Sequence, residues 1–142
     1  MKHVTFDEYA AAITRLLPVA HSDTGQSGKV AQVLLSLYNS FNFHCALVEL
    51  SGLDEDLYND CLTAIRGRVE INLDPQRVIE NGQQVFERLV ELWPGLRIEE
   101  RAKVSCRLCD GRGLVFRHGD YDDEGTVCTY CRGTGRVCSC RQ

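Results

Sequence analysis

Two blocks near the end of the chain repeat the pattern C-x-x-C-x-G-x-G, the first over residues 106–113 and the second over residues 128–135. Their four cysteines are Cys106, Cys109, Cys128 and Cys131. Two residues between paired cysteines let one tight turn direct both sulfurs at a single ion, and two such pairs supply the four thiolates of a tetrahedral zinc site. The spacing therefore predicts one zinc ion. Because four sulfurs close the coordination sphere, the site is expected to be structural rather than catalytic.

The glycines of the two blocks predict turns in which the chain adopts positive φ or approaches another backbone segment closely. These structural glycines are Gly111, Gly113, Gly133 and Gly135. Residues 114–116 and Val127 are prone to β structure, and residues 119–125 form a polar turn between them. We therefore expect two zinc knuckles that lead into a β-hairpin. The module is too short for a conventional core, so the metal must supply much of its folding free energy.

Other roles for the cysteines compete with zinc binding. The four could form disulfides or a redox pair, but paired C-x-x-C motifs in a reducing compartment favour a metal. Cys138 and Cys140 form a separate C-x-C pair near the end of the sequence, either as spare ligands or as reactive thiols. Cys45 and Cys61 lie in apolar surroundings and are expected to be inert.

Residues 104–138, which contain the doubled motif, resemble the cysteine-rich region of DnaJ-type chaperones. Four such repeats form two zinc sites in that family, whereas the two repeats here suffice for one, as in anti-TRAP-like proteins. The sequence has no His-Pro-Asp tripeptide of the kind that a J domain requires. The resemblance therefore implies a zinc module that binds another protein, without the co-chaperone activity.

Charge is divided unevenly along the chain. Residues 1–100 hold 8 basic and 15 acidic residues, a net charge of −7, whereas residues 101–142 hold 8 basic and 5 acidic residues, a net charge of +3. Zinc with four thiolates would add about −2, which leaves the loaded module nearly neutral. This balance weakens the hypothesis of nucleic-acid binding, which usually requires a strongly basic patch.

Five arginines of the module keep that alternative open, because guanidinium groups suit phosphate as well as carboxylate. The candidate interaction residues are Arg107, Arg112, Arg117, Arg132 and Arg136. A second alternative is a thiol-disulfide or holdase activity that uses Cys138 and Cys140.

Apolar periodicity in the acidic part predicts four amphipathic helices. The expected helices span residues 6–17, 30–38, 55–67 and 75–93, with Asp54 as the cap of the third. Thr5 and Glu8 form a capping box before the first, and Pro18 should end it. Gly67 should end the third helix, and Pro75 should open the fourth. Alternation over residues 69–73 suggests a brief extended segment.

The predicted fold is therefore mainly α, with a small helical bundle over residues 1–98 and a zinc-stabilised β-hairpin module over residues 99–142. Residues 22–93 also resemble a family of uncharacterised small proteins carried by bacterial mobile elements. That resemblance rests on residues 28–31, 34–39, 50–54 and 79–82. It implies an accessory role for such an element and no particular activity.

Compartment and function follow as expectations. No apolar run approaches the about 20 residues needed to cross a bilayer, and residues 1–8 lack the apolar segment of a signal peptide. We expect a cytoplasmic protein without a membrane partner. The sequence favours a non-enzymatic zinc protein that binds another protein as an adaptor, inhibitor or regulator.

Overall fold

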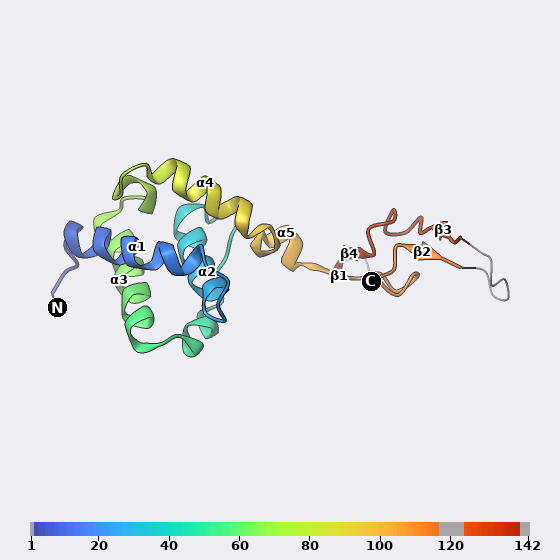
Figure 1. Ribbon diagram of the computed structural model, residues 1–142, viewed down its shortest axis with the longest axis horizontal. Helices are drawn as coiled ribbons and strands as arrows, with labels where there is room; N and C mark the ends of the chain where they lie inside the picture. Colours follow the sequence, from blue (N-terminus) through green and yellow to red (C-terminus); the bar gives the residue numbers. More distant parts are fainter. Residues whose placement is uncertain (1, 117–123, 140–142) are drawn as a thin grey trace. The chain divides into compact units, whose positions relative to one another are not determined.

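The computed structural model describes residues 2–116 and 124–139. The chain divides into two compact units, Met1–Ile98 and Glu99–Gln142. Figure 1 shows that the first unit is helical and that the described strands belong to the second. The predicted mainly α fold, followed by a small β module, is confirmed.

The first unit contains three-turn to five-turn helices joined by short 3-10 turns. Its elements are α1 (Phe6–Ala20), α2 (Ser27–Tyr38), η1 (Leu47–Gly52), α3 (Glu55–Ile71), η2 (Pro75–Arg77), α4 (Gly82–Leu92) and η3 (Pro94–Leu96). A short helix, α5 (Ile98–Arg101), follows. The capping box is present, because Thr5 Oγ1 accepts the Glu8 N–H at 3.2 Å and the Glu8 carboxylate accepts the Thr5 N–H at 2.9 Å.

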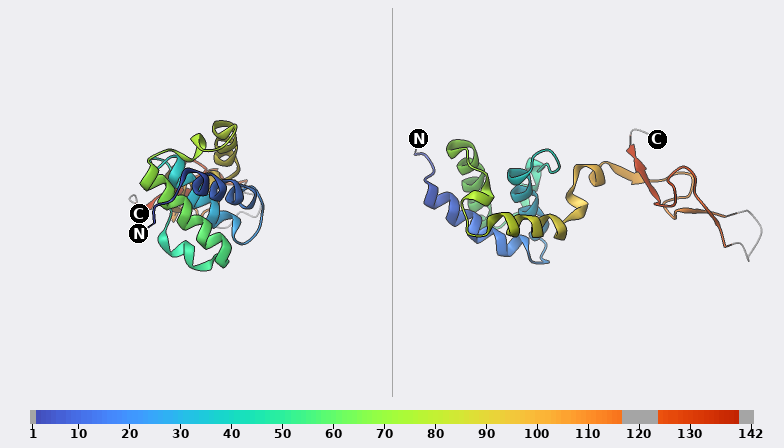
Figure 2. Two further views of the ribbon diagram at one scale, coloured as in Figure 1. Left: turned by 90° about the vertical axis from the view of Figure 1, so that its left-hand side faces the viewer. Right: turned by 90° about the horizontal axis from the view of Figure 1, so that it is seen from above.

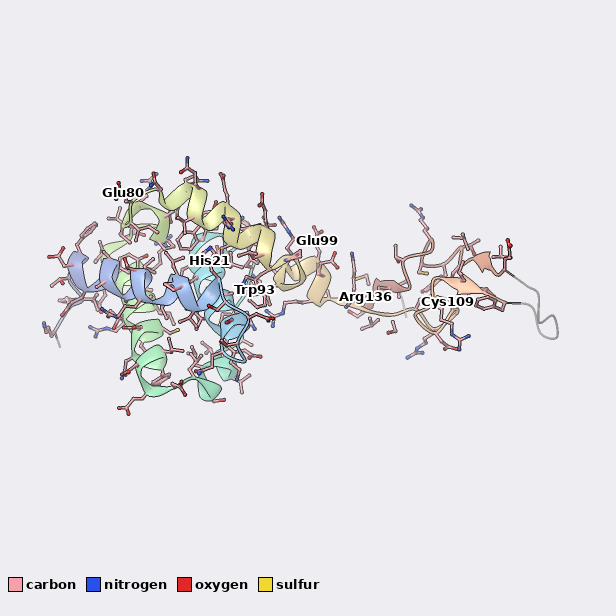
Figure 3. The ribbon with its side chains drawn as sticks, in the orientation of Figure 1. His21, Glu80, Trp93, Glu99, Cys109 and Arg136 are labelled. Carbon is pink, nitrogen blue, oxygen red and sulfur yellow. The ribbon has the colours of Figure 1, made fainter. Side chains whose placement is uncertain are left out.

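The core of the first unit forms where α1, α3, α4 and η2 pack against α2 (Figures 1 and 2). Its largest fully buried side chains include Tyr9, Ile13, Leu16, Leu34, Leu35, Phe86 and Leu89. Burial of each large apolar side chain contributes about 1.5–3 kcal/mol, so this core holds the helices together. The Trp93 indole closes one end by donating a hydrogen bond to the Ala20 carbonyl at 2.8 Å (Figure 3).

Two predicted helix ends were wrong. Pro18 lies inside α1, which continues to Ala20. A proline inside a helix costs about 3 kcal/mol, but complete burial of Leu16 and Ala20 favours the helical path. Gly67 likewise lies inside α3 rather than at its end. A Cβ at Gly67 would overlap the Tyr9 ring, so the glycine permits close packing between α1 and α3.

The segment predicted to be extended over residues 69–73 is helical as far as Ile71. The helix ends at Asn72, which has a φ of 60°. Asparagine adopts this left-handed conformation more readily than most residues and therefore ends the helix without a glycine.

The fourth predicted helix is divided in two. Pro75 opens η2 as expected, but α4 begins only at Gly82, after Asn81 with a φ of 54°. Because a left-handed residue interrupts a right-handed helix, residues 75–93 cannot form one continuous element. The second helix also begins earlier than predicted, at Ser27.

Glu70 predicts a pH dependence of the first unit. Its carboxylate accepts the Val4 N–H at 2.7 Å and pairs with Arg66 at 2.9 Å. The backbone hydrogen bond from Val4, followed by the Arg66 guanidinium, lowers the pKa of Glu70 below its ordinary value of 4.5. Its charge therefore stabilises the fold fully above about pH 4.5, and this contribution is lost as the pH falls through the lower folded pKa.

Thermal unfolding of Glu70→Gln should accordingly occur at a lower temperature than that of the parent at neutral pH, and the two curves should converge under acid conditions. The exposed Glu80 provides a matched control in Glu80→Gln. If the unfolding temperatures of Glu70→Gln and the parent differ by the same amount at every pH, the charge of Glu70 is not the cause of the lost stability.

Candidate metal centre

Four short strands position the cysteines of the second unit. They are β1 (Lys103–Ser105), β2 (Leu114–Val115), β3 (Thr126–Val127) and β4 (Arg136–Cys138). Strands β2 and β3 pair antiparallel, as the predicted hairpin requires, with Leu114 opposite Val127. Strands β1 and β4 also pair antiparallel, with Val104 opposite Val137, and this second pairing was not predicted. Residues 119–123 of the polar turn predicted over residues 119–125 lie outside the described residues.

The structure brings Cys106, Cys109, Cys128 and Cys131 together; all four residues are buried, and their Sγ atoms lie within 4.8 Å of one another. Cys109 is labelled in Figure 3. The Sγ atoms of Cys106 and Cys128 are 3.9 Å apart, and those of Cys109 and Cys131 are 3.7 Å apart. Zn–S bonds of about 2.3 Å in a tetrahedron place sulfurs about 3.8 Å apart. A disulfide requires about 2.05 Å, and the four thiols are free. The cluster therefore has the donor set and the size of one tetrahedral metal site.

The first knuckle aims backbone N–H groups at its own cysteines. Gly111 N–H donates to the Cys106 carbonyl at 3.0 Å, and Gly113 N–H donates to Cys109 Sγ at 3.2 Å. The turn requires positive φ at three residues, namely 52° at Asp110, 79° at Gly111 and 77° at Gly113. The N–H donor to sulfur stabilises negative charge on a thiolate, which is the form that binds a metal.

The second knuckle repeats this geometry at a spacing of 22 residues. Gly133 N–H donates to the Cys128 carbonyl at 3.1 Å, and Gly135 N–H donates to Cys131 Sγ at 3.2 Å. The φ angles are 54° at Arg132, 82° at Gly133 and 73° at Gly135. The two halves are thus structural copies, and the glycines occupy equivalent positions.

The halves also bind each other reciprocally. Cys106 N–H donates to the Gly135 carbonyl at 2.8 Å, and Cys128 N–H donates to the Gly113 carbonyl at 2.9 Å. A Cβ at Gly113 would overlap the Gly133 carbonyl, so the close approach of the two backbone segments excludes any residue larger than glycine at position 113. The sequence signal for this arrangement is the repeat itself, because equivalent residues of the two blocks form equivalent hydrogen bonds.

The protein environment acts unequally on the thiols. Burial raises the pKa of Cys106 to about 11. Burial opposes ionisation of Cys131 as well, but the Gly135 N–H and the thiols of Cys128 and Cys109 outweigh it and lower the pKa of Cys131 to about 6. The thiolate form of Cys131 is therefore favoured at neutral pH. Deprotonation of all four sulfurs requires a bound cation to compensate their charge.

The remaining predicted interaction and thiol residues that the structure describes lie at the surface of the second unit. Arg107, Arg112, Arg132 and Arg136 are exposed, as is Cys138 at the end of β4. Arg132 and Arg136 line one hollow together with Cys138, whereas Arg107 and Arg112 do not line it. Arg117 and Cys140 lie outside the described residues.

Cys61 of the first unit is expected to resist alkylation. It is fully buried, and burial, followed by the nearby Cys45, raises its pKa to about 12. Because the thiolate is the nucleophile, folded protein treated with iodoacetamide at mildly alkaline pH should show labelled Cys138 and unlabelled Cys61 in peptide mass spectra. Treatment in guanidinium chloride with a chelator should label both. Rapid labelling of Cys61 in the folded state would contradict its burial.

Comparison with protein families matches residues 10–94, from the middle of α1 to the start of η3, to a family of unknown function. This segment makes up more than half of the sequence. The chain belongs to DUF7673. The DUF7673 segment holds most of the helical core and ends before the first of the four clustered cysteines.

Two further comparisons of this DUF7673 chain, with curated proteins and with solved structures, give no match. Within the described part of the chain, no helix combines the length and the apolar character that a membrane crossing requires.

Proposed function

We propose that the chain is a zinc-binding protein-interaction module that acts as an adaptor, inhibitor or regulator of another protein. The observation that carries the proposal is the buried cluster of four sulfurs, whose 3.7 and 3.9 Å separations fit a closed tetrahedral site. A tetrahedral set of four thiolates selects zinc or iron, and zinc is the metal of the DnaJ-type module that residues 104–138 resemble. Such a site builds a rigid surface and has no open position for a reacting molecule.

The surface of the second unit supports protein binding. Leu108 is 60% exposed and Tyr130 is 45% exposed, and they occupy the same position in the two C-x-x-C turns. Val127 and Phe116 are also exposed, at 57% and 45%. Exposed apolar side chains on so small a module are typical of protein-binding surfaces, where aromatic residues and arginine are enriched.

The charge of the first unit bears on the kind of partner that the protein would bind. Its family membership fixes no activity, but its acidic character would favour a basic partner surface, including one that normally contacts nucleic acid. The resemblance of residues 22–93 to proteins of mobile elements supports an accessory, regulatory role in the cytoplasm of a bacterial host.

Affinity capture from host lysate with the zinc-loaded full chain tests this function. One sample is treated with nuclease and one is not, and metal content is measured before each capture. A stoichiometric protein that survives nuclease, and that is lost with the double variant Leu108→Ser, Tyr130→Ser at unchanged zinc content, supports the proposal. Recovery of nucleic acid alone, or a protein lost on nuclease treatment, contradicts it. Iron in place of zinc would contradict the metal assignment.

A further inference from the structure

A hollow of about 420 Å³ lies on the second knuckle and β4 of the second unit. Its lining includes Lys103, Tyr130, Arg132, Thr134, Arg136 and Val137. Three of these side chains are cationic, two are apolar or aromatic, and none of the carboxylates in the described residues lines the hollow. This composition fits an anionic ligand that also carries apolar groups.

The cations of the hollow differ in how far they are already paired. Lys103 Nζ lies 2.6 Å from the Glu100 carboxylate, so its charge is largely compensated. The Arg136 guanidinium donates to two backbone carbonyls instead, at 3.0 Å to Lys103 and 3.4 Å to Glu100. These bonds fix the plane of the group (Arg136 is labelled in Figure 3), whose charge also acts on the nearby Glu100 carboxylate and remains able to attract a ligand.

The first knuckle provides an internal comparison for these arginines. At the repeat spacing of 22 residues, Asp110 is equivalent to Arg132 and Leu114 is equivalent to Arg136. Asp110 and Arg132 share the left-handed conformation, with φ angles of 52° and 54°. Aspartate is favoured at such a position and arginine is not. The left-handed turn therefore does not require arginine at position 132, and Arg136 makes two hydrogen bonds that Leu114 cannot make, so both arginines distinguish the second knuckle from the first.

We propose that this hollow binds the carboxylates of an acidic segment of the partner protein. Arg132 and Arg136 form the charge contacts, and Tyr130 and Val137 pack against apolar side chains between the carboxylates. The inference rests on the proposed protein-binding function and names the chemistry of the partner. Guanidinium groups pair with carboxylates in a planar, bidentate manner.

A peptide fits the hollow better than a nucleic-acid strand. Affinity for a phosphate backbone comes from a track of cations that follows successive phosphates. The hollow has three cations, one of which already pairs with Glu100, so it offers charge contacts for one or two carboxylates but no track for successive phosphates.

Fluorescence anisotropy with the zinc-loaded full chain tests the inference. The probes are a labelled short peptide of alternating Glu and Leu, its Gln and Leu counterpart, and an oligothymidylate. The double variant Arg132→Asp, Arg136→Leu copies the first knuckle and is therefore expected to keep its zinc. We expect it to bind the acidic peptide at least about tenfold more weakly than the parent.

Arg112→Thr is the matched control, because Thr134 is the equivalent residue of the second knuckle and Arg112 lies outside the hollow. It should change peptide affinity by less than about twofold. Equal binding of the two peptides, an unaffected Arg132→Asp, Arg136→Leu protein, or preference for the oligothymidylate would each overturn the inference. If the Arg132→Asp, Arg136→Leu protein still captures the nuclease-resistant partner from lysate, this inference fails and the proposed function stands. If the parent captures no such partner, the proposed function fails.

Discussion

Replacement of Cys131 by serine is expected to unfold the second unit and to leave the helices of the first unit intact. Apart from the four cysteines, the core of the second unit contains only Val137 among the described residues, with Val104 partly buried against it. So small a core cannot compensate for the lost ligand, because structural zinc contributes about 10–16 kcal/mol of apparent binding free energy in comparable peptides. The zinc content should fall from one equivalent towards zero.

Three measurements on Cys131→Ser should agree. Metal analysis should find little zinc, trypsin should cleave rapidly after the arginines of the second unit, and far-UV circular dichroism should retain most of its helical signal. The matched control is Cys138→Ser, which removes an exposed thiol outside the cluster and should change none of the three. Full zinc content and unchanged resistance to trypsin in Cys131→Ser would refute the ligand assignment.

Replacement of Gly82 by alanine should destabilise the first unit by roughly 2–3 kcal/mol, in the upper range for overpacking. A Cβ at this position would overlap the Gln76 carbonyl, and a backbone group cannot move aside as a flexible side chain can. Either η2 or the start of α4 must shift. The gain in helix propensity from glycine to alanine, about 0.5–1 kcal/mol, is too small to offset this overlap.

Urea unfolding of Gly82→Ala, monitored by the helical circular dichroism signal, provides the measurement. Gly95→Ala is the control, because no heavy atom outside its chain neighbours lies within 4 Å of a Cβ at that position. Its free energy of unfolding should stay within about 0.5 kcal/mol of the parent value. Comparable stability of the two variants would show that η2 and α4 are not held as closely as the structure indicates.

Local sequence signals correctly predicted helix starts in the first unit where the residue type at the start determines the local conformation. The capping box at Thr5 and the proline that opens η2 are such cases. Prediction failed where tertiary packing outweighs local preference. Proline and glycine commonly end helices. Pro18 nevertheless lies inside α1, because the residues around it are buried in the core. Gly67 lies inside α3, because a side chain there would overlap the Tyr9 ring. No pattern along a single helix contains that information.

The candidate metal centre was more predictable than the strands around it. The C-x-x-C spacing is a local property, so the sequence alone indicates all four clustered cysteines. Strands β1 and β4 escaped prediction because each has three residues and the two lie far apart in the sequence. The positions of the arginines relative to the hollow depend on tertiary structure, since the hollow includes Arg132 and Arg136 but neither arginine of the first knuckle.

The reciprocal hydrogen bonds between the knuckles have a consequence for assembly. Cys106 and Cys128 each donate to a carbonyl of the opposite half, so either half is complete only when a second half is present. A half from another chain would offer the same donors, acceptors and sulfurs, which makes exchange of halves between two chains a low-cost route to a dimer. Because the two halves of one chain meet at an effective concentration on the order of millimolar, the closed single chain should dominate until the protein itself approaches that concentration.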